Sequence, residues 1–156
     1  MIRVRKGRPE DIEALKQLFS DTVRAICCQD YSPEQIEAWA AGTDDEGHWE
    51  RINAEQTVLV AHNGRAIMGF ATLDNDYIDM FYVHKDEQRQ GVGRALYKRM
   101  LSEAAAQGQT KLMADVSLTA KPFFERMGFS IIKQEQTERG GTRLLRFKMM
   151  AHLPRS

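Results

Sequence analysis

The sequence IDMFYVHKDEQRQGVGRALYKRM, residues 78–100, carries the most information about the fold of this chain. It starts as an apolar extended run that ends at Val83, crosses a polar bend, and reaches a glycine turn at residues 88–93. Val92, Leu96 and Met100 then recur at four-residue spacing, which predicts a helix. Glycines allow the backbone to approach a phosphate closely, and the first N–H groups of a helix have no intrahelical partners. The stretch therefore predicts a strand and a helix joined by an anion-binding turn.

Two common phosphate-binding patterns do not fit this turn. A Walker P-loop requires a lysine and a hydroxyl residue after its glycines, whereas Gly91 is followed by Val92, Gly93 and Arg94. A dinucleotide-binding fingerprint requires a third glycine where Leu96 stands, and the strands ahead of the turn are predicted to be antiparallel. The sequence therefore disfavours an NTPase and a nicotinamide-dependent enzyme.

The chain ahead of this stretch is predicted to form a strand, two helices and three antiparallel strands. Ser32-Pro33-Glu34-Gln35 is a capping box with proline at the first helical position, which predicts a helix start. Asn63-Gly64 favours a type I′ hairpin turn. The polar segment 43–56 is interpreted as a loop or a short helix. Hydrophobic periodicity predicts a strand at residues 2–4, helices over 12–26 and 33–42, and strands over 58–60, 66–73 and 77–83.

The chain after this stretch is predicted to form a strand, a short helix and a terminal hairpin. The strand covers residues 112–116, the helix covers 120–127 and ends at Gly128, and the hairpin strands 129–136 and 144–150 flank a turn at Arg139-Gly140-Gly141. We therefore expect one α/β (α+β) domain over residues 1–156, with a mixed, mostly antiparallel sheet flanked by about four helices.

Composition excludes several classes of partner. The chain has 156 residues, and 22 Lys and Arg balance 22 Asp and Glu, so no net field favours nucleic acid or a membrane surface. Any anionic ligand must be held by a local device. Cys27 and Cys28 are adjacent and cannot form an ordinary cross-linking disulfide. No Cys or His spacing is typical of a metal site, so no metal is expected. We expect a cytoplasmic protein without a membrane span, as a monomer or homodimer.

The turn Gln88-Arg89-Gln90-Gly91-Val92-Gly93 resembles the Q/R-x-x-G-x-G/A signature of the GCN5-related N-acetyltransferase (GNAT) superfamily. The order of the predicted elements matches that family over nearly the whole chain. Residues 120–129, AKPFFERMGF, resemble the family element that follows the fifth strand. Residues 31–40 and 119–126 are similar to a branch of small bacterial members, the YafP-like proteins. The resemblance implies the GNAT fold.

The resemblance also implies an acetyl-CoA site. Backbone groups of Phe81, Tyr82 and Val83 would bind the pantetheine arm as an added strand, because the fourth and fifth strands of the GNAT fold separate there. Ser117 would add a hydroxyl contact, and Lys121 would reach the 3′-phosphate or else face water. The turn would hold the pyrophosphate through Gln88, Arg89, Gln90, Gly91, Val92, Gly93 and Arg94. The alternative for Arg89 and Arg94 is that both guanidiniums are only solvated.

The reaction implied is direct attack of a primary amine on the thioester of acetyl-CoA, in a ternary complex. Asp79 interrupts an apolar strand, on the face expected for Phe81, and is the candidate base; a solvent-facing strand residue is the alternative. His84 is a second candidate by pKa. Phe124 stands where many relatives have the tyrosine that protonates the thiolate. The remaining hydroxyl donors are Tyr82, Ser117, Tyr31 and Tyr97.

The acceptor is predicted to be a small-molecule amine. Tyr31 and Trp39, with Asp79, are the candidate substrate contacts, and Trp49 belongs to the same region; the tryptophans are equally compatible with a core role. Two other functions stay open: a non-catalytic acyl-CoA sensor and a protein-lysine acetyltransferase. For Cys27 and its neighbour, a structural role is favoured over a covalent acetyl-enzyme because no His-Asp or His-Asn partner lies near them in the sequence.

Overall fold

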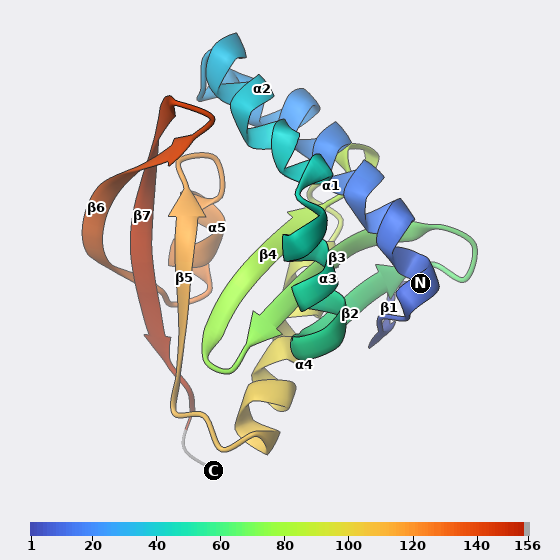
Figure 1. The fold of residues 1–156 in the computed structure, drawn as a ribbon. Coiled ribbons are helices and arrows are strands. Elements are labelled where there is room, and N and C mark those ends of the chain that lie inside the picture. The colour runs from blue at the N-terminus through green and yellow to red at the C-terminus, as the bar shows by residue number, and fades with distance from the viewer. Residues whose placement is uncertain (155–156) are drawn as a thin grey trace.

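Strand-period and helix-period segments alternate along the chain, and they assemble into one sheet with helices on both faces (Figure 1). The structure is a computed structural model and describes residues 1–154. The helices are α1 (Ile12–Ile26), α2 (Pro33–Ala40), α3 (Glu46–Glu55), α4 (Val92–Ala106) and α5 (Lys121–Arg126). The strands are β1 (Arg3–Lys6), β2 (Thr57–His62), β3 (Ile67–Asp74), β4 (Tyr77–Val83), β5 (Lys111–Ser117), β6 (Ser130–Arg139) and β7 (Thr142–His152).

The sheet has seven strands in the order β1-β2-β3-β4-β5-β7-β6. Every neighbouring pair is antiparallel except β4 and β5, which are parallel and are connected through α4. This topology confirms the predicted mixed, mostly antiparallel sheet.

Two apolar clusters hold the layers together. One lies between the sheet and α1, α2 and α3, with Phe19, Trp49 and Phe70 at its centre. The other lies between the sheet and α4 and α5, with Leu96 and Phe124 in it. Side chains alternate across a strand, so each cluster draws on alternate residues of the central strands. The polypeptide between these clusters is therefore covered on both faces.

One local prediction is narrowed and one is corrected. Of the two interpretations of the polar segment 43–56, a loop or a short helix, the helix is observed: α3 has ten residues and makes five helices where about four were expected. Asp45 caps it by accepting the N–H of His48 at 3.2 Å. The β2–β3 turn is not type I′, because its loop has four residues and only Gly64 has a positive φ, of 91°. The Asn63 side chain accepts backbone N–H groups of that loop instead, as asparagine commonly does in turns.

The most consequential irregularity is a bulge in β4 at Asp79. Leu73 of β3 pairs with Ile78, but Thr72 pairs with Met80, so Asp79 is an extra residue without a partner on β3. A bulge redirects a side chain and bends its strand. The prediction that Asp79 shares a face with Phe81 is therefore wrong: Asp79 contacts α3, whereas Phe81 packs against α5.

The same bulge marks where β4 leaves β5. Only two residue pairs join these strands, Tyr77 with Met113 and Ile78 with Ala114. Beyond Ile78, β4 has no strand partner on this side, and the two strands diverge in Figure 1. The backbone of residues 79–83 is thus left with one edge open to a ligand.

Candidate active site

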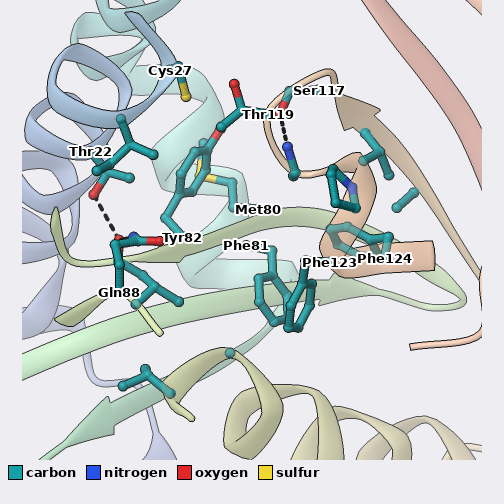
Figure 2. Close-up of a pocket in the computed structure, with 18 of the residues that line it drawn as sticks. Thr22, Cys27, Met80, Phe81, Tyr82, Gln88, Ser117, Thr119, Phe123 and Phe124 are labelled. Atoms are coloured by element: carbon teal, nitrogen blue, oxygen red, sulfur yellow. Dashed lines mark hydrogen bonds between the residues drawn. The ribbon is translucent and has the colours of Figure 1, made fainter. Parts of the chain in front are cut away.

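A cavity of about 800 Å³ fills the gap between the separating strands. It passes from the α1 side of the sheet to the α5 side, so both faces contribute to its walls. Figure 2 shows Cys27, Met80 and Tyr82 on one side of β4, and Phe81 with Phe123 on the other. Its lining includes these predicted cofactor residues: Phe81, Tyr82, Val83, Gln88, Arg89, Gly91, Val92, Gly93, Arg94 and Ser117.

The glycine turn closes one end of the cavity. Gly91 is the N-cap of α4 and has a φ of 88°, in the left-handed region that favours glycine. No side chain caps the helix, so its first N–H groups are available to an anion. Gly93 allows α5 to approach, because a Cβ there would lie 3.0 Å from the Phe123 ring. The turn therefore has the backbone geometry of a phosphate cradle.

Three arginines line this cavity: Arg89, Arg94 and Arg126. Among residues 1–154, none of the three has an acidic partner within ion-pair distance. Arg126, on α5, was not a sequence candidate. Lys121 was, but it does not line the cavity; its ammonium donates to Glu125 at 3.2 Å and lies over the Phe147 ring.

Gln88 and Gln90 occupy different environments. Gln88 lines the cavity, and its side-chain amide donates to the Val83 carbonyl at 2.7 Å. The same carbonyl also accepts a hydrogen bond from the Thr22 hydroxyl at 3.2 Å. Gln90 is exposed, lines no described cavity, and donates only to the Asp86 carbonyl, at 3.5 Å. Gln88 thus orders the end of β4 beside the glycine turn.

A smaller cavity of about 110 Å³ joins the first on the α2 side of the sheet. It lies between α2, the separating strands and the β6–β7 hairpin. Tyr31, Thr137 and Arg139 line it but not the larger cavity. The residues that line both cavities mark their junction: Trp39, Asp79, Tyr82, Asp115 and Ser117. The three candidate catalytic residues meet at this junction: Asp79 and Tyr82 from β4, and Ser117 from the end of β5.

Asp79 is held at the junction by two donors. His48 Nε2 lies 2.7 Å from Oδ2, and Gln56 Nε2 donates to the same oxygen at 2.9 Å. Burial opposes ionisation, but these hydrogen bonds and the positive charge of Arg139 outweigh it and lower the pKa of Asp79. The hydrogen bond to Asp79 raises the pKa of His48 despite partial burial. Asp79 is therefore an ionised carboxylate at neutral pH.

The candidate hydroxyl donors differ in their remaining hydrogen-bonding capacity. Tyr31 is fully engaged, because its hydroxyl donates to the Leu145 carbonyl at 2.6 Å and accepts the Leu118 N–H at 2.7 Å. Tyr82 accepts the Trp39 indole at 3.2 Å, and Ser117 accepts the Ala120 N–H at 3.1 Å, so each keeps its proton. Tyr97 lies in the α4 core and lines neither cavity.

Other candidates lie away from the junction. His84 lines neither cavity and accepts the Asp86 N–H at 3.1 Å in a short helical turn, so its position does not suit a base. Trp49 is 1% exposed and donates to the Gly42 carbonyl at 3.0 Å, so it is a core residue. Cys27 lines the larger cavity although it is far in sequence from β4, and burial raises the pKa of its thiol to about 12.

Sequence reasoning missed four polar groups of the site: His48, Asp115, Arg126 and Arg139. Asp115 lies on the less buried face of β5, between buried Ala114 and Val116, so the strand period gave no reason to single it out. Its Oδ2 accepts the Tyr77 hydroxyl and lies 3.7 Å from Arg146, whereas its buried Oδ1 has no partner among the described residues. Arg126 lies in the short helix α5, and His48 and Arg139 lie in polar stretches without a hydrophobic period.

The comparisons with known proteins agree with this geometry. A family model described as "Acetyltransferase (GNAT) domain" matches residues 27–151. The N-acetyltransferase YafP of Escherichia coli K12, described as uncharacterized, is 37% identical over 148 residues, covering 95% of this chain and 94% of YafP. A crystal structure titled as a GCN5-related N-acetyltransferase from Rhodopseudomonas palustris is 32% identical, has a TM-score of 0.92, and covers 97% of this chain and 95% of that one.

A third relative was solved with the cofactor present. The PaiA N-acetyltransferase of Thermoplasma acidophilum, in complex with coenzyme A, is 20% identical, with a TM-score of 0.76 and coverage of 97% of this chain and 99% of that one.

The chain belongs to the GNAT superfamily and to its YafP-like branch. It is an N-acetyltransferase, and acetyl-CoA is its co-substrate. Within residues 1–154 no helix is both long and apolar enough to cross a membrane.

Proposed function

We propose that this enzyme acetylates a primary amine of a small molecule, by direct attack of the amine on acetyl-CoA in a ternary complex. The observation that carries the proposal is the junction of the two cavities at Asp79, Tyr82 and Ser117. The larger cavity, of about 800 Å³, has the volume and the cationic lining for the cofactor, whereas the smaller one, of about 110 Å³, has room for a compact acceptor.

The cofactor is proposed to bind with its pyrophosphate on the glycine turn and its pantetheine arm along β4. The N–H groups at the start of α4 and the guanidiniums of Arg89 and Arg94 would neutralise the pyrophosphate. Arg126 lines the same cavity, whereas Lys121 does not and donates to Glu125. Arg126 is therefore the better candidate than Lys121 to bind the 3′-phosphate of CoA. The open edge of residues 79–82 would hydrogen-bond the pantetheine amides, whereas the Val83 carbonyl is already used by Gln88 and Thr22.

Asp79 is proposed to accept the proton of the attacking amine, directly or through water. The amine must be neutral to attack, and a lysine-like amine with a pKa near about 10.4 is mostly protonated at neutral pH. Once nitrogen bonds to the carbonyl carbon, its N–H becomes a far stronger acid, and an ionised carboxylate accepts that proton. Because Oδ2 is occupied, Oδ1 of Asp79 is the acceptor atom.

The C–S bond then breaks, the N-acetyl product forms, and CoA leaves as a thiolate that takes up a proton. Phe124 carries no proton to give. The hydroxyls of Tyr82 and Ser117 are proposed as donors to the sulfur, because each lies at the junction and keeps a proton that no protein acceptor uses. A backbone N–H of β4 would stabilise the carbonyl oxygen.

Direct transfer is proposed over a Cys27 acetyl-enzyme. A thiol of pKa about 12 is ionised in only about one molecule in 10⁵ at neutral pH, and the thiolate is the nucleophilic form. The Cys27→Ala variant is expected to keep its activity, and no acetyl group is expected on the protein by mass spectrometry. An acetylated Cys27 peptide that transfers its acetyl group to the amine would overturn direct attack.

The proposal is tested by CoA release from acetyl-CoA with a panel of small primary amines and a lysine peptide, with products identified by mass spectrometry. Initial rates at varied concentrations of both substrates should give intersecting lines. Asp79→Asn should lower kcat/KM by about 10²- to 10⁴-fold while acetyl-CoA affinity stays unchanged. Asp74→Asn changes an exposed carboxylate at the end of β3; it is the matched control and should behave as the native enzyme.

Two outcomes would reject the proposal. Tight acetyl-CoA binding without turnover of any amine indicates the acyl-CoA sensor. Turnover of the lysine peptide alone indicates a protein-lysine acetyltransferase.

We further propose a single domain over residues 1–156, a cytoplasmic location, and a monomer or homodimer that requires no nucleic acid.

A further inference from the structure

The charges that line the smaller cavity are separated by sign. Its two carboxylates, Asp79 and Asp115, both lie at the junction with the cofactor cavity. Its two guanidiniums, Arg139 and Arg146, line only the smaller cavity, on the side of the β6–β7 hairpin. A ligand that enters this cavity therefore meets negative groups near the acetyl donor and positive groups away from it.

The two arginines are not equivalent. Arg146 is neutralised by the protein, because its guanidinium lies 2.9 Å from Glu135 and 3.7 Å from Asp115. Arg139 has no acidic partner within ion-pair distance among residues 1–154. It is nevertheless close enough for its charge to lower the pKa of Asp79. Arg139 is thus a guanidinium at the cavity wall with all its donors available to a ligand.

The negative end has an available acceptor as well. Asp79 uses only Oδ2, so its Oδ1 is open to a donor on the ligand. Asp115 adds negative charge beside it, but its Oδ1 is buried from solvent and its Oδ2 accepts the Tyr77 hydroxyl. An ammonium or amine group satisfies this end of the cavity.

The hairpin that carries Arg139 is fixed in position. The Gln35 side chain of α2 donates to the Arg143 carbonyl of β7 at 2.9 Å, and the Tyr31 hydroxyl donates to the Leu145 carbonyl. Arg139 forms the last pair of the hairpin, with Thr142, before a turn of two glycines with positive φ. The strand end that bears the guanidinium is therefore held against α2.

We propose that the acceptor is a small primary amine that carries an anionic oxygen group at its far end, with its amine on Asp79 and its anion on Arg139. This inference rests on the proposed function. A guanidinium binds a carboxylate or a phosphate in a bidentate manner, so either anion suits Arg139. The aromatic walls, Tyr31, Trp39 and Tyr82, cover the carbon skeleton between the two ends.

The test uses acceptors in matched sets. Amino acids such as leucine, β-alanine and 4-aminobutyrate form the carboxylate arm, and aminoalkyl phosphates form the phosphate arm. Each is compared with the amine of the same skeleton that lacks the anion. In the native enzyme, at least one anionic arm should exceed its neutral counterpart by about 10- to 100-fold in kcat/KM. The preferred arm identifies the anion.

Arg139→Gln should remove this preference. It should raise the KM of the anionic acceptor by about 10- to 100-fold and leave the KM of the matched neutral amine unchanged. An effect of the lost charge on the Asp79 carboxylate acts on kcat for both acceptors alike, so the ratio of their kcat/KM values is the readout. Arg143→Gln is the matched control, because Arg143 is an exposed arginine on the same hairpin that lines neither cavity. Arg143→Gln should leave kcat/KM unchanged for both the anionic and the neutral acceptor. The acetyl-CoA affinity of both variants should equal that of the native enzyme, which also reports that they fold.

Three results distinguish a failure of this inference from a failure of the proposed acetyltransferase function. Equal or better use of the neutral amines overturns the inference and leaves the small-molecule acetyltransferase in place. An equal effect of Arg139→Gln on charged and neutral acceptors also overturns it, because the arginine then has only a structural role. No turnover with any member of the panel overturns the proposed function and this inference together.

Discussion

Asp79 and His48 form a pair that is central to the site and that only the folded chain reveals. Because the carboxylate is ionised, His48 donates its Nε2 proton to Oδ2. Gln56 donates to the same oxygen, so the orientation of the carboxylate is fixed from two directions. His48 lines neither cavity, and we therefore assign it a positioning role for Asp79.

The pair has a definite pH signature in stability. His48 has a raised pKa, so its contribution is complete below about pH 6.5 and is lost as the pH rises through the raised value. Asp79 has a lowered pKa, so its contribution is present above about pH 3.9 and is lost as the pH falls through the lowered value. The pair therefore stabilises the fold most between these two limits.

His48→Gln should reduce the free energy of unfolding most at about pH 4 to 6.5, and the difference from the native chain should shrink at higher pH. Urea unfolding at a series of pH values measures this difference. His152→Gln, at the exposed end of β7, is the control and should leave the profile unchanged. A loss of stability that grows as the pH rises above 6.5 contradicts the assigned direction for His48.

The start of α4 depends on one backbone conformation. Gly91→Val should abolish acetyl-CoA binding, because a β-branched residue at a φ of 88° is strained and would shift the N–H groups of the turn. Gly64→Val imposes the same strain, at a φ of 91°, in the β2–β3 loop away from both cavities. It should cost stability but preserve binding. Native acetyl-CoA affinity in Gly91→Val, measured by calorimetry, would reject the pyrophosphate assignment.

Tyr31 joins three elements through its hydroxyl. It lies just ahead of α2, donates to β7 at Leu145, and accepts from Leu118 after β5. Tyr31→Phe leaves the Leu118 N–H without its acceptor and should lower the free energy of unfolding by about 1–3 kcal/mol. Tyr97→Phe removes a hydroxyl that makes no hydrogen bond with the described residues and should be nearly neutral. Equal chemical denaturation midpoints for the two variants would contradict this role.

The sequence predicted regular elements well, because strand and helix periods are local. The capping box at Ser32 is an example: its hydroxyl accepts the Gln35 N–H and the Gln35 side chain accepts in return. The extra residue at Asp79 could not be predicted, because a bulge is defined only against the partner strand. His48 and Arg139 reach the site through tertiary packing of polar segments, which leaves no periodic trace.

Across the whole molecule, charge is distributed by function although it sums to zero. The 22 cations and 22 anions cancel, yet three arginines without acidic partners among the described residues line the larger cavity. We propose that these guanidiniums, together with the N–H groups at the start of α4, are the local binding site that an anionic ligand of a neutral protein requires. Salt should therefore weaken the binding of acetyl-CoA without a comparable effect on folding.

The separation of β4 from β5 also leaves a weak seam in the sheet. Two residue pairs join these strands, whereas seven pairs join β5 to β7 and six join β3 to β4. In the free protein the amides that border this seam should exchange with solvent faster than those inside either half of the sheet. In the proposed binding mode acetyl-CoA spans the seam, so it should slow hydrogen exchange on both sides, at residues 79–83 and 115–117. The co-substrate would then take the place of a missing strand and tie the two halves of the sheet together.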